Sequence, residues 1–357
     1  MKTILENFRL EGNVGEVLPL GSGLINDTYR VMTDEGPNYV LQRINHAIFK
    51  DVELLQNNIE AVTAHIRAKL VAAGEVDVDR KVLNFIPLKE SAQTWLFDGS
   101  SYWRVSVLIA DSITIDTVNP EYSYYAGKAF GNFQSMLSDI DSTLGETIPD
   151  FHNMELRERQ LADAVAADAV GRMASEEVQA ILAQMHEYMH DMTLAERLHR
   201  EGALPKRICH CDTKVSNMLF DKSGQVLCVI DLDTVMPSFI FSDYGDFLRT
   251  AANKVAEDSP ELDKVEFDME IFKAFTKGYI ESASSFLTDV ERENLPYAAA
   301  LFPFMQAVRF FTDYINGDTY YKIAYPEHNL VRTRNQMALF RSVMAHKAKM
   351  EAFIAAL

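Results

Sequence analysis

One short segment of the chain combines the side chains that phosphoryl transfer needs. It reads His210-Cys211-Asp212-Thr213-Lys214-Val215-Ser216-Asn217, and the apolar run at residues 226–230 that follows it ends at Asp231. A carboxylate beside an attacking hydroxyl accepts its proton, and an amide oxygen with a second carboxylate holds the magnesium ion that bridges nucleotide phosphates. The pattern His-x-Asp-x-x-x-x-Asn followed by Ile-Asp therefore predicts a phosphoryl-transfer site.

Each polar residue of this pattern has an expected role. We assign Asp212 as the base or orienting carboxylate, and Asn217 and Asp231 as the ligands of magnesium. Lys214 lies two residues after the base, where its charge suits the transferring phosphoryl group. A turn aspartate that caps its own loop is the alternative for Asp212, and Asp233 is an alternative or second metal ligand. The joint spacing favours the catalytic interpretation.

These side chains require a short hairpin to bring them together. Residues 218–220 and 226–230 read as strands, and the turn between them contains Gly224, which can adopt the left-handed conformation that a tight turn needs. Such a hairpin places Asn217 and Asp231 at neighbouring strand ends. Two further carboxylates, Asp243 and Asp246, are expected to brace the catalytic loop through backbone N–H groups.

The elements on either side of the hairpin predict an α+β fold with two lobes. Residues 14–20, 28–33, 39–41, 94–97 and 102–108 read as antiparallel strands, and residues 51–70 read as a helix. Helices are expected over 124–137, over 155–198 with a break near Gly171 and a restart at Ser175, and from residue 267 onward. We therefore expect a nucleotide-binding lobe at 1–109 and a catalytic and substrate-binding lobe at 110–357.

Composition is compatible with a soluble enzyme and excludes several rivals. The 357 residues include 52 acidic and 34 basic side chains, and the formal charge of −18 disfavours nucleic acid or an anionic membrane as a partner. No stretch has the length of a membrane-spanning helix, and the N-terminus lacks a signal-peptide core. We expect a cytoplasmic protein whose three cysteines are buried and reduced.

With these motifs the chain resembles the aminoglycoside phosphotransferase and choline kinase group of protein-kinase-like small-molecule kinases. Within the group it is most similar to the N-acetylhexosamine 1-kinase branch, and the similarity covers nearly the whole chain. The matching segments are Ile25-Asn26, Thr28-Tyr29, Tyr39-Val40-Leu41-Gln42, Asp212-Thr213-Lys214, Ile230-Asp231-Leu232-Asp233-Thr234, Met236-Pro237 and Tyr325-Pro326-Glu327-His328-Asn329-Leu330-Val331-Arg332-Thr333-Arg334.

The resemblance implies a bilobal protein-kinase-like fold. It also implies ATP- and magnesium-dependent phosphorylation of the anomeric hydroxyl of N-acetylglucosamine or N-acetylgalactosamine. By resemblance Arg309 and Tyr320 bind the sugar, although Arg309 and Asp313 are also spaced to pair with each other along a helix. Arg332 and Arg334 have the alternative of being solvated surface charges.

The resemblance also implies a nucleotide site in the N-terminal lobe. Gly21 and Gly23 lie in the first hairpin turn, where backbone N–H groups can approach phosphates. Gln42, followed by Arg43, stands where the broader group has a strand lysine, and the sugar kinase branch has glutamine there as well. Glu60, on the helix that would supply the partner of that lysine, then lacks an obvious cation.

Two departures from the branch leave competing functions open. Leu24 replaces a histidine of the branch and Thr250 stands where the branch can carry an aromatic residue, and both positions are expected near the sugar. These departures motivate a kinase of the same fold that acts on another hexose, an amino alcohol or an aminoglycoside. A nucleotide-binding pseudokinase is the alternative from another class. Gluco versus galacto preference, nucleotide selectivity and oligomeric state are not encoded in these motifs.

Overall fold

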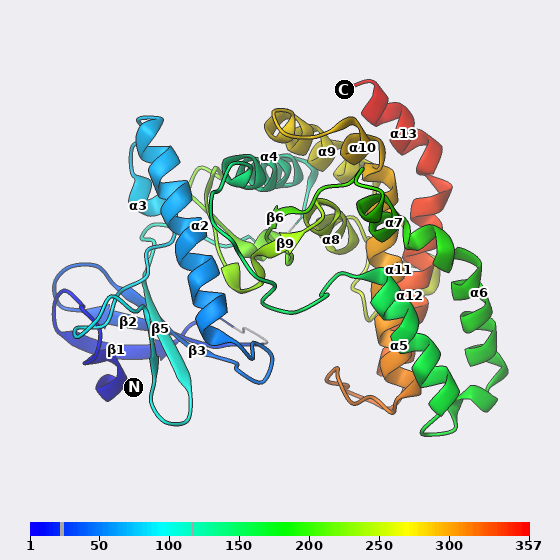
Figure 1. The fold of residues 1–357 in the computed structure, drawn as a ribbon, viewed down its shortest axis with the longest axis horizontal. Coiled ribbons are helices and arrows are strands. Elements are labelled where there is room, and N and C mark those ends of the chain that lie inside the picture. The colour runs from blue at the N-terminus through cyan, green and yellow to red at the C-terminus, as the bar shows by residue number, and fades with distance from the viewer. Residues whose placement is uncertain (22–24, 116–117) are drawn as a thin grey trace. The chain divides into compact units, whose positions relative to one another are not determined.

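The computed structural model describes residues 1–21, 25–115 and 118–357, and the chain forms two compact units that are each discontinuous in sequence. The first unit contains Met1–Ile115, Met136–Pro149 and Ser216–Met236, and the second contains Asp116–Ser135, Asp150–Val215 and Pro237–Leu357. Figure 1 labels their elements. The predicted boundary between residues 109 and 110 falls inside the first unit and stays a prediction.

A five-stranded antiparallel sheet forms the centre of the first unit, as the strand patterns predict. The strand order is β1-β2-β3-β5-β4. The strands are β1 (Val14–Pro19), β2 (Asp27–Thr33), β3 (Tyr39–Ile44), β4 (Trp95–Phe97) and β5 (Tyr102–Val107). The predicted α+β class, with a small antiparallel sheet ahead of a mostly helical region, is confirmed.

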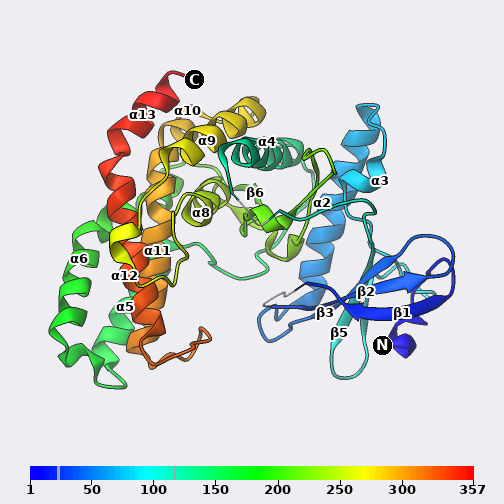
Figure 2. The same ribbon diagram turned by 180° about the vertical axis from the view of Figure 1, so that it is seen from behind.

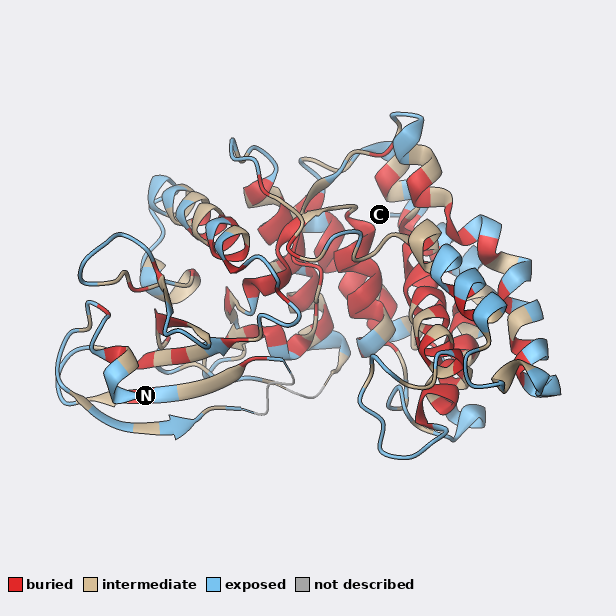
Figure 3. Cartoon of the chain, turned by 60° about the horizontal axis from the view of Figure 1, so that its bottom comes forward, coloured by how far each residue is buried: buried red, intermediate tan, exposed pale blue. Residues whose placement is uncertain are grey.

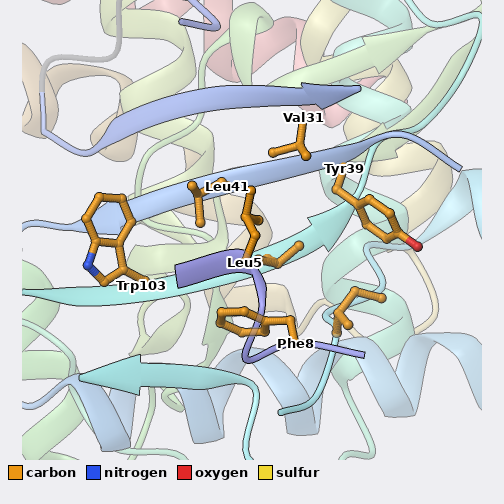
Figure 4. Close-up of a cluster of buried hydrophobic side chains, with 8 residues drawn as sticks. Leu5, Phe8, Val31, Tyr39, Leu41 and Trp103 are labelled. Carbon is orange, nitrogen blue, oxygen red and sulfur yellow. The ribbon is translucent and has the colours of Figure 1, made fainter. Parts of the chain in front are cut away.

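The two faces of this sheet have different chemistry because side chains alternate along each strand. One face is apolar and packs against α1 (Lys2–Leu5) and the segment after it. Figure 4 shows that core, which contains Leu5, Phe8, Val31, Tyr39, Leu41, Ile86, Trp103 and Val105. The intervening positions carry Thr28, Gln42 and Arg104, which are direct cross-strand neighbours. Polar side chains thus form a row on the second face.

Helix α2 (Val52–Ala72) lies beside the sheet in the first unit, as Figures 1 and 2 show. It begins as predicted at Asp51, whose carboxylate accepts a hydrogen bond from the Leu54 N–H at 2.9 Å. Asn58 on its buried side donates to the carbonyls of Gly145 at 2.8 Å and Val235 at 2.9 Å. The helix therefore holds two later segments of the chain in place.

The first unit also contains the predicted hairpin. Strands β7 (Met218–Phe220) and β8 (Val226–Val229) pair in antiparallel fashion, and Met218 is opposite Val229. The short 3-10 turn η3 (Leu232–Thr234) follows, and η2 (Val215–Asn217) precedes the hairpin. A small helix, α3 (Val78–Lys81), packs against β8. The hairpin prediction is confirmed.

The second unit is helical, and buried residues are concentrated within its helices (Figure 3). Its helices are α4 (Pro120–Leu137, which ends in the first unit), α5 (Met154–Ala167), α6 (Glu176–Met192), α7 (Leu194–Arg200), α8 (Phe241–Ala251), α9 (Met269–Ala283), α10 (Asp289–Glu293), α11 (Leu295–Ile315), α12 (His328–Ala345) and α13 (Lys347–Ala355). The second unit also contains the 3-10 turns η1 (Arg172–Ala174) and η4 (Leu262–Lys264) and the short strand β6 (Arg207–Cys209). The partner of β6 is β9 (Met236–Ser238), whose first residue belongs to the first unit.

The predicted helical stretch from 155 to 198 consists of three helices. The break near Gly171 is confirmed, and α6 restarts at Ser175, whose hydroxyl accepts from the Val178 N–H at 3.5 Å. A second interruption at Thr193 was not predicted, and it separates α6 from α7. No described helix is long and apolar enough to cross a membrane.

Helices α4 and α9 approach each other very closely through glycines. A Cβ atom on Gly127 would lie 2.1 Å from the Phe275 carbonyl oxygen, and one on Gly278 would lie 2.2 Å from the Tyr124 carbonyl oxygen. Both distances are shorter than any side chain tolerates. The absence of a side chain at these two positions is therefore a condition for this packing.

Candidate active site

The two residues predicted to bind metal lie at adjoining ends of the β7–β8 hairpin. The Ile230 N–H donates to the Asn217 carbonyl at 2.9 Å, which holds the end of β8 against the start of β7. Asp231 follows with a left-handed backbone, at φ 60° and ψ 57°. Among the described residues no three His, Cys, Asp or Glu side chains form a metal cluster. An amide oxygen and a carboxylate nevertheless fit magnesium, which takes its remaining ligands from water and phosphate.

Asp233 has a different environment from Asp231. Its carboxylate is 3% exposed, and one oxygen lies 2.5 Å from the Arg104 Nη2 while the other accepts from the Asn26 amide at 2.6 Å. Arg104 comes from β5, and its Nε also donates to the Gln42 Oε1 at 2.9 Å. Arg104 is missing from the sequence-based site. The alternation of side chains along β5 predicts that Arg104 lies on the polar face of the sheet. Its contact with Asp233 could not be predicted, because the two residues are far apart in the chain.

The residues predicted for the nucleotide site have distinct positions in the first unit. Gly21 has a left-handed backbone at φ 74°, and a Cβ there would meet nothing within 4 Å. Gly23 and Leu24 lie outside the described residues. Gln42 belongs to the polar row of the sheet, whereas Arg43 points to the other side of β3 and forms an exposed ion pair with Asp27. Their roles stay predictions.

Asp212 and Lys214 are neighbours in the second unit. The Lys214 Nζ lies 2.7 Å from the Asp212 Oδ1, and the two side chains are 44% and 27% exposed, respectively. Burial opposes the charge of Lys214, but attraction and hydrogen bonding to Asp212 raise its pKa above the ordinary value. Lys214 therefore stays protonated beside the predicted base.

A buried carboxylate holds the backbone of this loop. Asp243 of α8 accepts from the backbone N–H of His210 at 3.0 Å and of Cys211 at 2.8 Å, and from the Gln134 amide at 2.8 Å. The Thr213 hydroxyl donates to the Asp243 carbonyl at 2.7 Å. Cys211 needs this support, because its backbone is left-handed at φ 63°. The prediction that Asp243 braces this loop through backbone N–H groups is confirmed, and the catalytic role of the loop stays a prediction.

Asp246, by contrast, faces a cavity that Asp212 and Lys214 also line. The cavity has a volume of about 110 Å³ and lies within the second unit. Its lining residues are Phe151, His152, Cys211, Asp212, Lys214, Asp246, Arg249, Phe302, Met305, Gln306 and Arg309. Bracing of the loop was predicted for both carboxylates. Among the described contacts, the backbone N–H groups of the loop donate to Asp243 and not to Asp246.

The charges of this cavity are largely paired. Arg249 donates to Asp246 through Nε at 3.0 Å and reaches Glu257 through Nη1 at 2.8 Å. Burial raises the pKa of Asp246, and the negative charge of Asp212 raises it further while Arg249 opposes the shift. Asp212 forms an ion pair with Lys214, and Asp246 forms one with Arg249, so each carboxylate that lines the cavity has a cationic partner.

His152 contributes an uncharged polar edge to the cavity. Its Nδ1 lies 3.0 Å from the Ser242 hydroxyl, and its ring stacks on Phe151 and meets Phe302 edge-on. Burial lowers its pKa well below the usual value, and the positive charges of Arg309, Arg157 and Arg249 act in the same direction. His152 is therefore a neutral imidazole. Sequence analysis missed it, because a single histidine in a loop carries no pattern.

Arg309 and Tyr320 were predicted to bind the substrate, and only Arg309 lines the cavity. Its guanidinium lies over the rings of Phe151 at 5.4 Å and Tyr321 at 5.7 Å, and it donates to Gln306 at 3.2 Å. In the described part of the chain its contacts do not include the carboxylate of Asp313. Tyr320 is 67% exposed and packs edge-on against Tyr321. Both substrate roles stay predictions.

Asp313 organises the loop that carries these tyrosines. Its Oδ1 accepts from the backbone N–H of Thr319 at 2.9 Å and of Tyr320 at 2.8 Å, and its Oδ2 accepts from the Tyr321 N–H at 3.0 Å. Nearby, Arg334 forms a two-point ion pair with Glu177. The carboxylate of Asp313 therefore binds the backbone of the loop and does not form the expected i,i+4 ion pair with Arg309 among the described contacts.

Several solved structures share this fold. An aminoglycoside phosphotransferase from Alicyclobacillus acidocaldarius is 13% identical with a TM-score of 0.66, and the match covers 100% of this chain and 97% of that one. A choline kinase from Cryptosporidium parvum is 12% identical with a TM-score of 0.60, covering 96% and 93%. An amicoumacin kinase in complex with AMP-PNP, Ca²⁺ and Ami is 12% identical with a TM-score of 0.57, covering 91% and 88%.

The sequence itself matches a family profile over more than half of its length. The profile is that of the phosphotransferase enzyme family, and the match spans residues 16–274. That range contains all of the first unit's sheet except the start of β1, the hairpin with Asn217 and Asp231, and the loop with Asp212. The chain belongs to the phosphotransferase enzyme family.

Proposed function

We propose that this protein is a kinase that transfers the terminal phosphoryl group of ATP to the anomeric hydroxyl of an N-acetylhexosamine. The observation that supports a neutral sugar as acceptor is the charge of the cavity around Asp212. Its two carboxylates face Lys214 and Arg249, and Arg309 adds a third cation. A cationic acceptor such as choline would meet a net positive wall, whereas sugar hydroxyls and an acetamide oxygen accept hydrogen bonds from these donors.

The other walls of the cavity suit a sugar ring as well. Phe151, Phe302 and Met305 offer apolar surface, while the neutral His152 and the amide of Gln306 offer polar edges. The lining is more polar than apolar, and convergent polar groups beside aromatic rings are the features that orient a small polar ligand in its pocket. The amicoumacin kinase of the same fold binds AMP-PNP, which supports an adenine nucleotide as donor.

In the proposed reaction each residue has one task. Asp212 accepts the proton of the attacking hydroxyl, and Lys214 offsets charge on the transferring group. Asn217 and Asp231 would hold magnesium, which neutralises the nucleotide phosphates when it is bound. Binding energy from the cavity walls orients the hydroxyl toward the phosphorus atom.

The test is a coupled ADP-release assay with ATP and magnesium over a panel of acceptors. The panel contains N-acetylglucosamine, N-acetylgalactosamine, glucose, galactose, choline and an aminoglycoside, and ³¹P NMR identifies the phosphorylated position. Asp212→Asn should lower kcat by roughly 10²- to 10⁴-fold, because proton transfer to a positioned base contributes that much. The matched control is Asp191→Asn, which neutralises an exposed carboxylate at the end of α6 and should leave kcat unchanged.

The outcomes separate the candidate functions. Turnover confined to N-acetylhexosamines, with a sugar 1-phosphate as product, supports the proposal. Turnover of choline or the aminoglycoside alone would assign a cationic acceptor and refute the charge argument. Nucleotide binding without turnover of any acceptor would favour the pseudokinase.

A further inference from the structure

Arg104 is a buried cation in the middle of the sheet of the first unit. It lies on β5 directly opposite Gln42 of β3, which is itself opposite Thr28 of β2. Its side chain is 2% exposed, its Nε donates to the Gln42 Oε1 at 2.9 Å, and the Gln42 Nε2 reaches the Thr28 hydroxyl at 3.4 Å. The polar row of the sheet thus ends in a guanidinium held in one orientation.

Arg104 forms an ion pair with Asp233, two residues after the predicted metal ligand Asp231. Both side chains are almost completely buried. Burying two charges costs free energy that their attraction rarely exceeds, so an apolar pair of similar size would serve stability equally well. The Arg104 Nη1 is also buried, and within the described ranges it has no hydrogen-bond partner. Stability alone therefore does not account for this pair.

The second oxygen of Asp233 is fixed as well. It accepts from the Asn26 Nδ2 at 2.6 Å, and the Asn26 Oδ1 accepts in turn from the Asn45 N–H at 2.9 Å. The carbonyl of Val235, two residues further on, accepts from Asn58 of α2 at 2.9 Å. The turn η3 is therefore held to the sheet through the contacts of Asp233, and the residue after the turn, Val235, is hydrogen-bonded to helix α2.

We infer that Arg104 is a positioning residue that sets the geometry of Asp231 by holding Asp233 in the turn η3. Gln42 occupies the strand position where the broader group has a lysine. In this arrangement Arg104 of β5 supplies a buried cation beside that position, and Gln42 orients its guanidinium. Glu60 of α2 accepts a hydrogen bond from the Thr94 hydroxyl, and within the described ranges it forms no ion pair. Asp233 is then an anchor of the turn and not a second metal ligand. This inference rests on the proposed function, because it assumes that Asp231 binds a metal–nucleotide complex.

The test compares metal–nucleotide binding in the wild-type protein and in Arg104→Gln. Calorimetry measures the Kd of MgADP, and electron paramagnetic resonance measures Mn²⁺ binding in the presence of ADP. We expect Arg104→Gln to raise both Kd values by tenfold or more while the KM of the acceptor changes less than twofold. Arg104→Lys keeps the charge and should recover part of the affinity. Arg30→Gln removes the same charge from an exposed position of β2 and serves as the matched control.

The sign of the change distinguishes an anchor from a ligand. If Asp233 binds the metal and Arg104 merely competes for it, then Arg104→Gln will tighten Mn²⁺ binding, and that result overturns the inference. Equal binding by the wild type and Arg104→Gln also overturns it. As the pair acts as one unit, Arg104→Gln with Asp233→Asn should bind no more weakly than the worse single variant.

Two further measurements keep the result interpretable. If Arg104→Gln does not fold, Gln42→Leu keeps the guanidinium but removes the hydrogen bond that orients it, together with the longer one to Thr28, and should still weaken MgADP binding severalfold. Unchanged MgADP binding by folded Gln42→Leu would then count against the inference. A wild-type protein that binds neither MgADP nor Mn²⁺ would refute the proposed function and this inference together. If the wild type binds both and the variants bind them equally well, the inference alone is refuted.

Discussion

Acidification should destabilise the second unit through His152. The folded protein holds the pKa of this imidazole well below its ordinary value, because desolvation in the cavity and the positive charges of Arg309, Arg157 and Arg249 disfavour the protonated form. The unfolded chain binds a proton at the ordinary histidine pKa of 6.5. Since the unfolded state then holds more protons than the folded state, the free energy of unfolding falls as the pH drops below that value. The penalty grows by up to about 1.4 kcal/mol for each pH unit.

The measurement is a difference between the wild type and His152→Gln, which cannot take up the proton. Urea unfolding at about pH 7.5 and about pH 5.5 should show that the wild type loses up to about 1.4 kcal/mol more than the variant between the two conditions. The carboxylates titrate equally in both proteins and cancel. Two-dimensional NMR of the histidine side chains gives a direct check, because the His152 signal should not shift over this range.

A different outcome would refute the reasoning in a specific way. If the two proteins respond equally to pH, or if the His152 signal titrates near its ordinary pKa, then the folded cavity accommodates an imidazolium. The positive wall that Arg309 and Arg249 form would then be too weak to exclude an additional cation. The charge argument against a cationic acceptor would fail with it.

Three further predictions follow from packing and burial. Gly278→Ala should lower the free energy of unfolding by about 2 kcal/mol or more, because its Cβ would lie 2.2 Å from a carbonyl oxygen of α4. Thermal or urea unfolding measures the loss. Gly15→Ala is the control and should be tolerated, because the nearest atom to its Cβ would lie at 3.4 Å. If the proposed sugar acceptor binds beside Tyr320, Asp313→Asn should raise the KM of that acceptor about tenfold and leave the KM of ATP unchanged, because the loop loses its charged hydrogen-bond acceptor. Equal changes in both constants would contradict this. The three cysteine thiols should resist a thiol reagent at about pH 8 until the protein is unfolded, because burial raises their pKa, in Cys228 to about 12.

The sequence predicted best what neighbouring residues determine. The hairpin and the adjoining positions of Asn217 and Asp231 follow from a turn of a few residues, and the start of α2 follows from the N-cap at Asp51. Such features depend on local backbone preferences, which a pattern of residue types records directly. The helical break near Gly171 is of the same kind.

Contacts between distant segments escaped prediction. The pair of Arg104 and Asp233 joins a strand to a turn far along the chain, and no spacing rule links them. His152 enters the cavity from the loop before α5, a placement that depends on how the helices of the second unit pack. The spacing of Arg309 and Asp313 even suggested a pairing that the loop around Tyr320 replaces, because Asp313 finds three backbone N–H groups there.

The bracing of the catalytic loop by Asp243 has a consequence for how this region opens. The N–H groups of His210 and Cys211 donate to the Asp243 side chain of α8. Their protection from hydrogen exchange therefore depends on the integrity of that helix, so loop and helix should open as a single cooperative unit. If Asp212 is the base, as proposed, a substitution that frays α8 would then slow catalysis without altering any residue of the loop.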